Sequence, residues 1–275
     1  MNKKTRQLQC RQKGRSLTKV LIVLVVLIVC FALFGPFFVP LVGDPHKTEA
    51  FPFDGGGPLN MGYDYLGRPV AAQLLIGGRE LLIAAFLTAV LSQVTGMTCG
   101  LIMAVLRKRT KILRFLLDMM LIIPMSLSTL VIYNHAGSSL YATIPIATFF
   151  TLPFTSRYYA GNAEPLLRTG FYEQAMVAGD SVPLALIREI IPVLFRPILT
   201  DLGMSMISAV YLMSTVSFLG IANNNNSFLW PTMVMQNLSG LALNPYATLM
   251  PIFAIVWLTI PLNILIDQFS NRRRK

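Results

Sequence analysis

A chain of 275 residues that is 54% hydrophobic and only 13% charged is not an ordinary soluble domain, because soluble proteins carry about a quarter charged residues. Its apolar runs are long and continuous, which indicates an all-α integral membrane protein. The net charge of +11 would suit a nucleic-acid binder. The basic residues instead cluster beside apolar runs, as in membrane proteins, so we expect membrane lipid and no nucleic acid as a partner.

The N-terminal region predicts a basic tail followed by a membrane anchor. Residues 1–19 carry seven basic side chains and no acidic one, and residues 20–42 form an uncharged apolar run. This run is too long for a typical signal peptide and lacks a clean cleavage site, so we expect an uncleaved first transmembrane helix. The basic flank predicts a cytoplasmic N-terminus. Residues 43–76, rich in glycine, proline and acidic side chains, predict an external loop.

Five further apolar runs predict five more transmembrane helices. We place them at residues 81–106, 113–133, 140–156, 194–219 and 246–266. Residues 220–245 form a predicted external loop, and residues 268–275 a second basic tail. With six spans both termini, the basic cluster at 107–111 and the polar stretch 158–192 all fall on the cytoplasmic side, in agreement with the positive-inside bias.

Single residues in these spans carry further expectations. Gly96 and Gly100 are a small-residue pair that lets a second helix approach closely. Arg114 and Asp118 have the i,i+4 spacing of an ion pair on one helix. Four prolines, expected to be static kinks rather than gating hinges, are Pro124, Pro145, Pro251 and Pro261.

The polar stretch 158–192 interrupts the apolar spans and predicts two short helices. They are separated by Gly179, and Pro192 closes the second. Apolar residues give this stretch a side that can dock on a partner; they are Ala175, Val177, Ala178, Leu184, Leu186 and Ile187. From spacing alone, a plain cytoplasmic loop with a helical hairpin is an equally good interpretation.

The sequence lacks the patterns of an enzyme. No G-x-x-x-x-G-K-[ST] loop is present, so ATP is not bound by that route. His46 and His135 stand alone in predicted loops, and we expect neither a metal site nor a catalytic residue. The charges lie at predicted span ends rather than at mid-bilayer; they are Arg114, Asp118, Arg157, Arg196, Asp201 and Asp267. We therefore expect the chain to carry no cofactor of its own.

Several motifs, in order along the chain, resemble one family. Glu173-Gln-Ala-Met-Val-Ala-Gly179, followed by Ile191-Pro192, resembles the E-A-A-x-x-x-G signature of permease subunits of ATP-binding-cassette (ABC) importers. Met61-Gly-Tyr-Asp64 with Leu66-Gly-Arg68 is similar to the L-G-T-D-x-x-G-R-D element of the dipeptide, oligopeptide and nickel branch. Gly78-Arg79, and Ser217-Phe-Leu-Gly220 followed by Trp230, are similar to two further elements of that branch. The likeness is greatest to its second, C-type, permease.

The chain departs from the family pattern at several positions. Pro69 replaces the aspartate after G-R, Gln174 replaces the first alanine of E-A-A, and Glu189 replaces a histidine. Residues 223–226 are an asparagine tract where the family has prolines, and Pro231 stands where glycine follows tryptophan. A solvated loop is the favoured interpretation of the tract. These departures indicate a divergent member whose substrate is not inherited.

The resemblance implies a type I ABC importer permease fold with a core at residues 77–267 and a cytoplasmic coupling helix. The implied ATPase-coupling residues are Glu173, Gln174, Ala175, Ala178, Gly179 and Asp180, with Glu189 and Pro192 ending the region. Implied partners are a second permease subunit, two cytoplasmic ATPase subunits that hold ATP and Mg²⁺, and an extracytoplasmic solute-binding protein. Asp64 and Arg68 either contact that binding protein or form a local ion pair.

The implied function is transport without catalysis in this chain. The permease would lie in the bacterial cytoplasmic (inner) membrane and conduct a peptide-like, nickel or metal-chelate or haem substrate. The alternative is a secondary transporter or channel subunit that ATP does not drive. A membrane enzyme would need a catalytic cluster that the sequence does not contain.

Overall fold

The computed structural model describes residues 3–107, 109–122, 128, 140–218 and 228–271. Most of these residues are helical. One isolated antiparallel bridge joins Tyr63 and Pro69. The chain forms two compact units, one of residues 1–83 with 213–275 and one of residues 84–212. Each unit is described below by itself.

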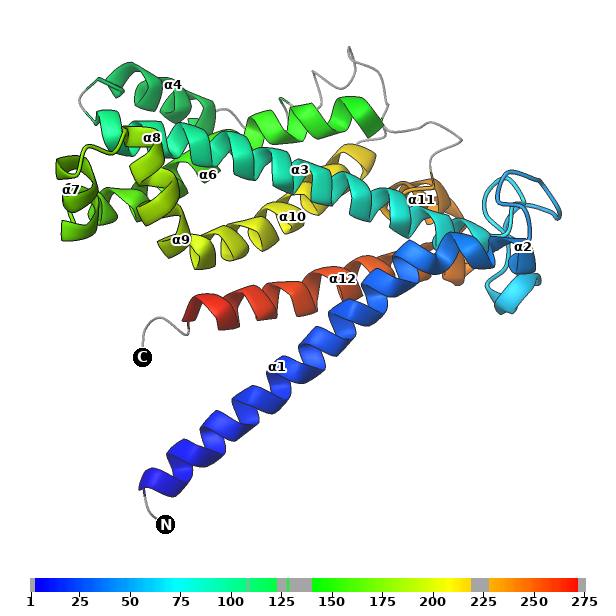
Figure 1. Ribbon diagram of the computed structural model, residues 1–275. Helices are drawn as coiled ribbons and strands as arrows, with labels where there is room; N and C mark the ends of the chain where they lie inside the picture. Colours follow the sequence, from blue (N-terminus) through cyan, green and yellow to red (C-terminus); the bar gives the residue numbers. More distant parts are fainter. Residues whose placement is uncertain (1–2, 108, 123–127, 129–139, 219–227, 272–275) are drawn as a thin grey trace. The chain divides into compact units, whose positions relative to one another are not determined.

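The first unit contains the two chain ends and the loop that follows the first helices. Its elements are α1 (Lys3–Phe34), η1 (Gly35–Phe38), α2 (Val39–Val42), η2 (Pro58–Asn60), the start of α3 (Val70–Leu106), α11 (Trp230–Asn237), η4 (Leu238–Gly240) and α12 (Pro245–Asn271). Both α1 and α11 pack against α12 (Figure 1). The Thr18 hydroxyl donates to the Gln268 amide oxygen at 2.5 Å and joins α1 to α12.

The second unit contains the remainder of α3 and the helices that follow it. Its elements are α4 (Lys111–Ile122), α6 (Leu140–Leu166), α7 (Gly170–Val177), α8 (Val182–Ala185), the π-helical turn η3 (Leu186–Ile190), α9 (Ile191–Val193) and most of α10 (Phe195–Phe218). The α4 helix packs against α6, and α7 packs against α8 and η3.

Two glycines bring α3 and α6 into close contact inside the second unit. A Cβ atom built on Gly96 would collide with the Thr155 side chain, and one on Gly100 would lie 2.5 Å from the Ser156 carbonyl oxygen. The partner of the predicted small-residue pair is therefore α6. The prediction that this pair admits a close helix is confirmed, because any larger residue would have to push α6 away.

Four helices are long and apolar enough to cross a membrane among the described residues. They are Thr18–Val42, Val70–Leu106, Phe195–Phe218 and Pro245–Gln268, and they correspond to the first, second, fifth and sixth predicted spans. The fourth predicted span lies within α6. The third begins in α4, and its remainder, with Pro124, lies outside the described residues, as do His135 and the asparagine tract. The count of six spans stays a prediction.

The structure corrects two predicted loops. Residues 70–76 are helical, since α3 begins at Val70, and the predicted loop 220–245 contains the buried helix α11. Both differences have one cause. The Trp230 side chain is fully buried, and its indole N–H donates to the Leu74 carbonyl at 2.9 Å. Gly77 and Gly78 leave the space that Phe228 and Trp230 occupy, so this tryptophan holds α11 against the first turns of α3.

The predicted ion pair between Arg114 and Asp118 is wrong. Arg114 pairs with Glu164 at 2.8 Å, and Asp118 pairs with Arg157. Both partners lie on α6, so the two charges of α4 reach across to the neighbouring helix instead of along their own. Because α4 packs on α6, cross-helix pairing satisfies both charges.

The prolines of the described spans lie inside helices that continue past them. Pro145 and Pro153 fall within α6, and Pro251 and Pro261 within α12. An interior proline removes one backbone hydrogen bond and bends a helix. That these prolines are fixed kinks rather than gating hinges stays a prediction.

Candidate functional site

Residues 170–193 form a helical hairpin made of α7, α8, η3 and α9, which we call the hairpin. Its turn is built on Gly179, whose φ of +93° favours glycine over any other residue. The Asp180 amide donates to the Ala175 carbonyl at 3.1 Å and the Gly179 amide to the Met176 carbonyl at 3.2 Å. These two bonds are the Schellman arrangement that ends a helix, so the glycine break that the sequence predicts is present.

The inner face of the hairpin is anchored to the second unit. Ala175 and Ala185 are buried, and Ile190 with Leu194 joins an apolar cluster that includes Tyr159. Burial of these side chains fixes the hairpin to α3 and α6. Ala175 therefore faces its own chain, which corrects the expectation that it lies on a face open to a partner.

The outer face of the hairpin is apolar and exposed. Phe171 is 70% exposed, Val177 89% and Ile187 62%, and Leu184 is also exposed. The predicted coupling residues on this surface, exposed in the structure, are Glu173, Gln174, Ala178 and Gly179, while Asp180 and Glu189 are half-buried. No other part of the described chain covers these side chains, and exposed apolar side chains of this size are typical of surfaces that contact lipid or a partner protein.

The hairpin passes into α10 with almost no interruption. The break that the sequence places at Pro192 falls one residue after the end of α9, at Leu194, and α10 begins at Phe195. The π-helical turn η3 precedes Pro192, and the Ile191 amide donates five residues back, to the Leu186 carbonyl. Such a turn is rare and concentrates at functional positions. The hairpin is therefore joined to α10 through the single residue Leu194.

A charged cavity lies where α3, α4 and α6 meet. It has a volume of about 300 Å³ and is lined by Met103, Arg114, Leu117, Asp118, Arg157, Ala160, Gly161 and Glu164. Arg114 donates to Glu164 and to the Met103 carbonyl, each at 2.8 Å. The hydrogen bond from Arg114, with Arg107 also nearby, lowers the pKa of Glu164 below its ordinary value. Sequence reasoning missed Glu164, because its partner lies 50 positions away.

A buried polar chain links α3, α6 and α10 in the second unit. The Gln93 amide donates to the Tyr159 hydroxyl and, at 3.2 Å, to the Ile198 carbonyl. Tyr159 in turn donates to the Asp201 carboxyl group. Asp201 is 7% exposed, so it is buried inside the bundle and not simply near the entrance of its span. Nothing in the sequence spacing predicts that these three residues meet.

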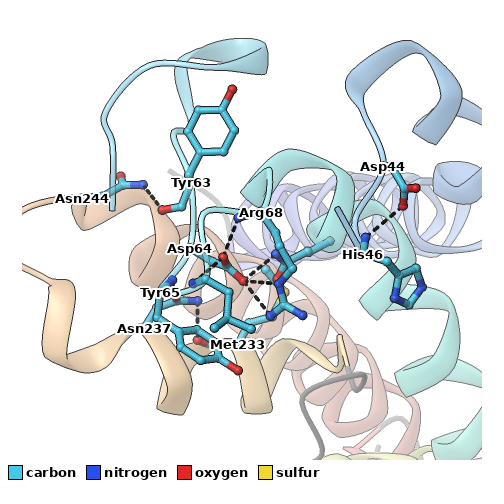
Figure 2. A network of polar contacts seen from close by, with 11 residues as sticks. Asp44, His46, Tyr63, Asp64, Tyr65, Arg68, Met233, Asn237 and Asn244 are labelled. Atoms are coloured by element: carbon cyan, nitrogen blue, oxygen red, sulfur yellow. Dashed lines mark hydrogen bonds and ion pairs between the residues drawn. The ribbon is translucent and has the colours of Figure 1, made fainter. Parts of the chain in front are cut away.

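Asp64 and Arg68 form the centre of a second arrangement, in the first unit, shown in Figure 2. The two side chains pair at 2.7 Å and are 0% and 5% exposed. The Asp64 carboxylate also accepts from the backbone amides of Leu66 and Arg68, at 2.9 and 2.7 Å, and from the Gln73 side chain at 2.8 Å. Of the two interpretations offered above, the structure shows the local ion pair. Its charged groups are covered and present no surface to a docked protein.

Two asparagines hold this loop to α11 and the start of α12. The Asn237 side chain accepts from the Tyr65 amide at 3.0 Å, and Asn244 donates to the Tyr63 carbonyl at 3.0 Å (Figure 2). Asn244 also donates to the Met61 carbonyl at 3.1 Å. Burial raises the pKa of the Tyr65 hydroxyl above its ordinary value. The asparagines are separated from their partners by more than 170 positions, which explains why sequence reasoning did not single them out.

In the described residues no group of three or more His, Cys, Asp or Glu gathers into a metal-binding cluster. What the structure offers is apolar helices of membrane-spanning length and an anchored hairpin with an exposed apolar face. These features define the class as a multi-pass helical membrane protein.

The family follows from comparison with known proteins. The model of the binding-protein-dependent transport system inner membrane components matches residues 96–275, which is more than half of the 275-residue chain. The chain therefore belongs to this family, and the resemblance inferred from the sequence motifs is confirmed.

Curated relatives agree with this assignment. The chain is 23% identical over 253 residues to the glutathione transport system permease protein GsiD of Pectobacterium atrosepticum, with 90% of this chain and 83% of that protein covered. It is 24% identical over 255 residues to the peptide transport system permease protein SapC of Haemophilus influenzae, with 90% and 85% covered. Both are permeases of transport systems that their names assign to peptides or glutathione.

Proposed function

We propose that this chain is one permease subunit of an ATP-driven importer for peptide-like substrates, with the hairpin as its coupling element. The observation that carries the proposal is the two-sided hairpin. One side is packed into the bundle through Ala185 and Ile190, and the other exposes Phe171, Val177 and Ile187. A docking surface that moves as one body with a membrane helix is what an external ATPase needs in order to act on the membrane helices.

The proposed partners follow from the family. A second permease of similar fold would complete the translocation path, two cytoplasmic ATPase subunits would hold ATP and Mg²⁺, and an extracytoplasmic binding protein would deliver the substrate. In this arrangement the chain crosses the inner membrane six times, with both termini and the hairpin in the cytoplasm. The names of GsiD and SapC favour a peptide-like substrate over nickel, a metal chelate or haem, and the C-type position in the pair is part of this proposal.

Ala178 and Glu173 have defined roles in the proposed contact. Glu173 lies on α7, Ala178 caps its C-terminal end, and both are exposed; the small side chain permits close approach of the ATPase, and the carboxylate offers a charge to a basic partner. Gly179 would keep its role as the turn that sets the angle between α7 and α8. Its hypothetical Cβ meets no neighbour, so only its backbone conformation restricts this position.

The test is substrate-stimulated ATP hydrolysis by the reconstituted complex. Val177→Asp places a charge on a side chain that is 89% exposed, so folding and membrane insertion are expected to stay intact. Stimulated hydrolysis should fall roughly tenfold or more, since a charge buried without a partner in an interface costs more than about 1.4 kcal/mol. Glu173→Lys should act in the same direction, and Gly179→Pro should abolish the turn because proline cannot adopt a positive φ.

The matched control is Glu49→Lys. Glu49 is exposed in the loop of the first unit, so the control makes the same charge change as Glu173→Lys at a residue that is not part of the hairpin. Hydrolysis equal to wild type in both Val177→Asp and Glu173→Lys would contradict the proposed coupling role.

A further inference from the structure

The buried chain of Gln93, Tyr159 and Asp201 contains two acceptor atoms that no donor reaches. They are the second carboxyl oxygen of Asp201, Oδ2, and the amide oxygen of Gln93, Oε1. Both atoms belong to side chains that bond the same tyrosine hydroxyl. A buried acceptor without a donor is unfavourable, and native proteins avoid it. Two such atoms beside one hydroxyl therefore point to a missing hydrogen.

The direction of the existing hydrogen bonds locates that hydrogen. The Gln93 amide nitrogen is committed to Tyr159 and to the Ile198 carbonyl, so its oxygen is free to accept. Tyr159 donates its single hydrogen to one oxygen of Asp201. A hydrogen on Oδ2 of Asp201 would supply the one donor that the group lacks, and Gln93 Oε1 is the acceptor that remains for it.

The charges around Asp201 favour the same conclusion. The titratable groups facing it from α6 are Tyr159 and, beside it, Tyr158, whose hydroxyl donates to the Pro197 carbonyl at 3.4 Å. The facing side chain of α3 is the uncharged Gln93, and Arg196 on α10 is exposed. Among the described residues no basic side chain forms an ion pair with Asp201. A carboxylate buried without a cation is strongly disfavoured, and it takes up a proton instead.

We propose that Asp201 is a proton-binding site, which in the packed bundle holds its proton between Oδ2 and Gln93 and closes a ring of hydrogen bonds across α3, α6 and α10. Binding converts the carboxylate and one proton from water into a neutral carboxylic acid, with no other reactant. The proton would leave when α10 separates from α3 and α6 and water reaches the carboxylate. This proposal does not rest on the coupling role of the hairpin.

Infrared difference spectroscopy of the full-length chain, purified from membranes and measured at pH 5, tests the proposal directly. The wild type should show the carbonyl stretch of a protonated carboxylic acid, and Asp201→Asn should lose it. Asp118→Asn is the control, because Asp118 is half-exposed and paired with Arg157, and it should leave this band unchanged. The absence of a difference between wild type and a folded Asp201→Asn variant would overturn the proposal and indicate an ionised Asp201 bridged by water.

A second variant keeps the test decisive if Asp201→Asn does not fold. Tyr159→Phe retains the carboxylic acid but removes the donor to its carbonyl oxygen, so the band should move to higher frequency. A band that neither shifts nor weakens in this variant belongs to another residue and would reject the assignment.

The pH dependence of stability gives an independent measurement. Unfolding would release the proton to water, so the melting temperature of the wild type should fall as the pH rises from about 5 to about 8. Asp201→Asn cannot release a proton and should show a smaller fall. Equal slopes for the two proteins would contradict the proposal, whatever the effect of hairpin variants on ATP hydrolysis.

Discussion

Replacing Asp64 by alanine should destabilise the first unit strongly. The carboxylate is fully buried, pairs with Arg68 at 2.7 Å and accepts from the amides of Leu66 and Arg68 and the side chain of Gln73. Its removal takes this carboxylate away from a guanidinium group that is 5% exposed. Breaking a buried pair in this way costs about 3–5 kcal/mol.

Aromatic rings beside Arg68 do not offset this cost. The Arg68 guanidinium lies 5.5 Å from the Tyr65 ring and 5.4 Å from the Phe228 ring, and each contact contributes about 0.5–1 kcal/mol, with about 2 as the upper range. These contacts exist in the wild type as well, so they do not replace the lost carboxylate. The expected loss for Asp64→Ala therefore stays near 3 kcal/mol or above, by the same buried-pair estimate.

The measurement is a denaturant titration in detergent, followed by tryptophan fluorescence. The chain has two tryptophans, and in a Trp257→Phe background Trp230 reports alone on the first unit, where it is fully buried. Asp54→Ala is the matched control, since Asp54 lies exposed in the same loop and its side chain accepts one long bond of 3.4 Å. It should cost less than about 1 kcal/mol. An Asp64→Ala loss no larger than that of the control would refute the structural role of the pair.

Two further predictions concern the second unit. Gly100→Ala should lower its stability by about 1–3 kcal/mol because the new methyl group meets the Ser156 carbonyl. Gly161→Ala, in an open position on α6, should leave stability unchanged or raise it by about 0.5–1 kcal/mol. Thermal melting of both variants separates the effect of the contact from that of helix propensity, and equal effects of the two substitutions would exclude the contact. The pKa of Glu164 is lowered in the folded state, so its pair with Arg114 contributes stability above the ordinary glutamate pKa, and that contribution is lost as the pH falls through the lowered value. Glu164→Gln should remove this loss of stability at acid pH, which is worth about 0.2–1 kcal/mol for a partly exposed pair. If the free energies of unfolding of the wild type and the variant differ by the same amount at every pH, the prediction is contradicted.

Hydropathy and motif order were enough to predict the helical membrane class and the family. The runs 20–42, 81–106, 194–219 and 246–266 carry their signal in composition, which needs no knowledge of neighbours, and their positions agree closely with four helices of the structure. The break between the two short helices at Gly179 could also be predicted, because a turn with positive φ favours glycine. The start of α3 was missed because Gly77 and Gly78 look like loop residues, while in the structure they make room for Phe228 and Trp230.

Contacts that depend on which way a helix faces could not be read from spacing. Arg114 and Asp118 had the correct spacing for a pair, yet α6 supplied better-placed partners to both. Asp64 and Arg68 have the same i,i+4 spacing and do pair. The difference lies in the surroundings, because the Asp64 pair is sealed inside a loop that also offers it backbone amides, whereas the α4 charges face a second charged helix. Sequence spacing alone does not show whether a charged side chain pairs within its own segment or with a neighbouring helix.

Tyr159 connects the two properties that the second unit needs for its proposed role. Its ring belongs to the apolar cluster that anchors the hairpin through Ile190 and Leu194, and its hydroxyl sits between Gln93 and Asp201. A shift of the hairpin large enough to move Leu194 must therefore move α10 relative to this hydroxyl or carry α6 with it. α3 and α6 approach closely at Gly100. Under the proposal above, a separation of α10 from α3 and α6 is the movement that would expose the proton of Asp201 to water.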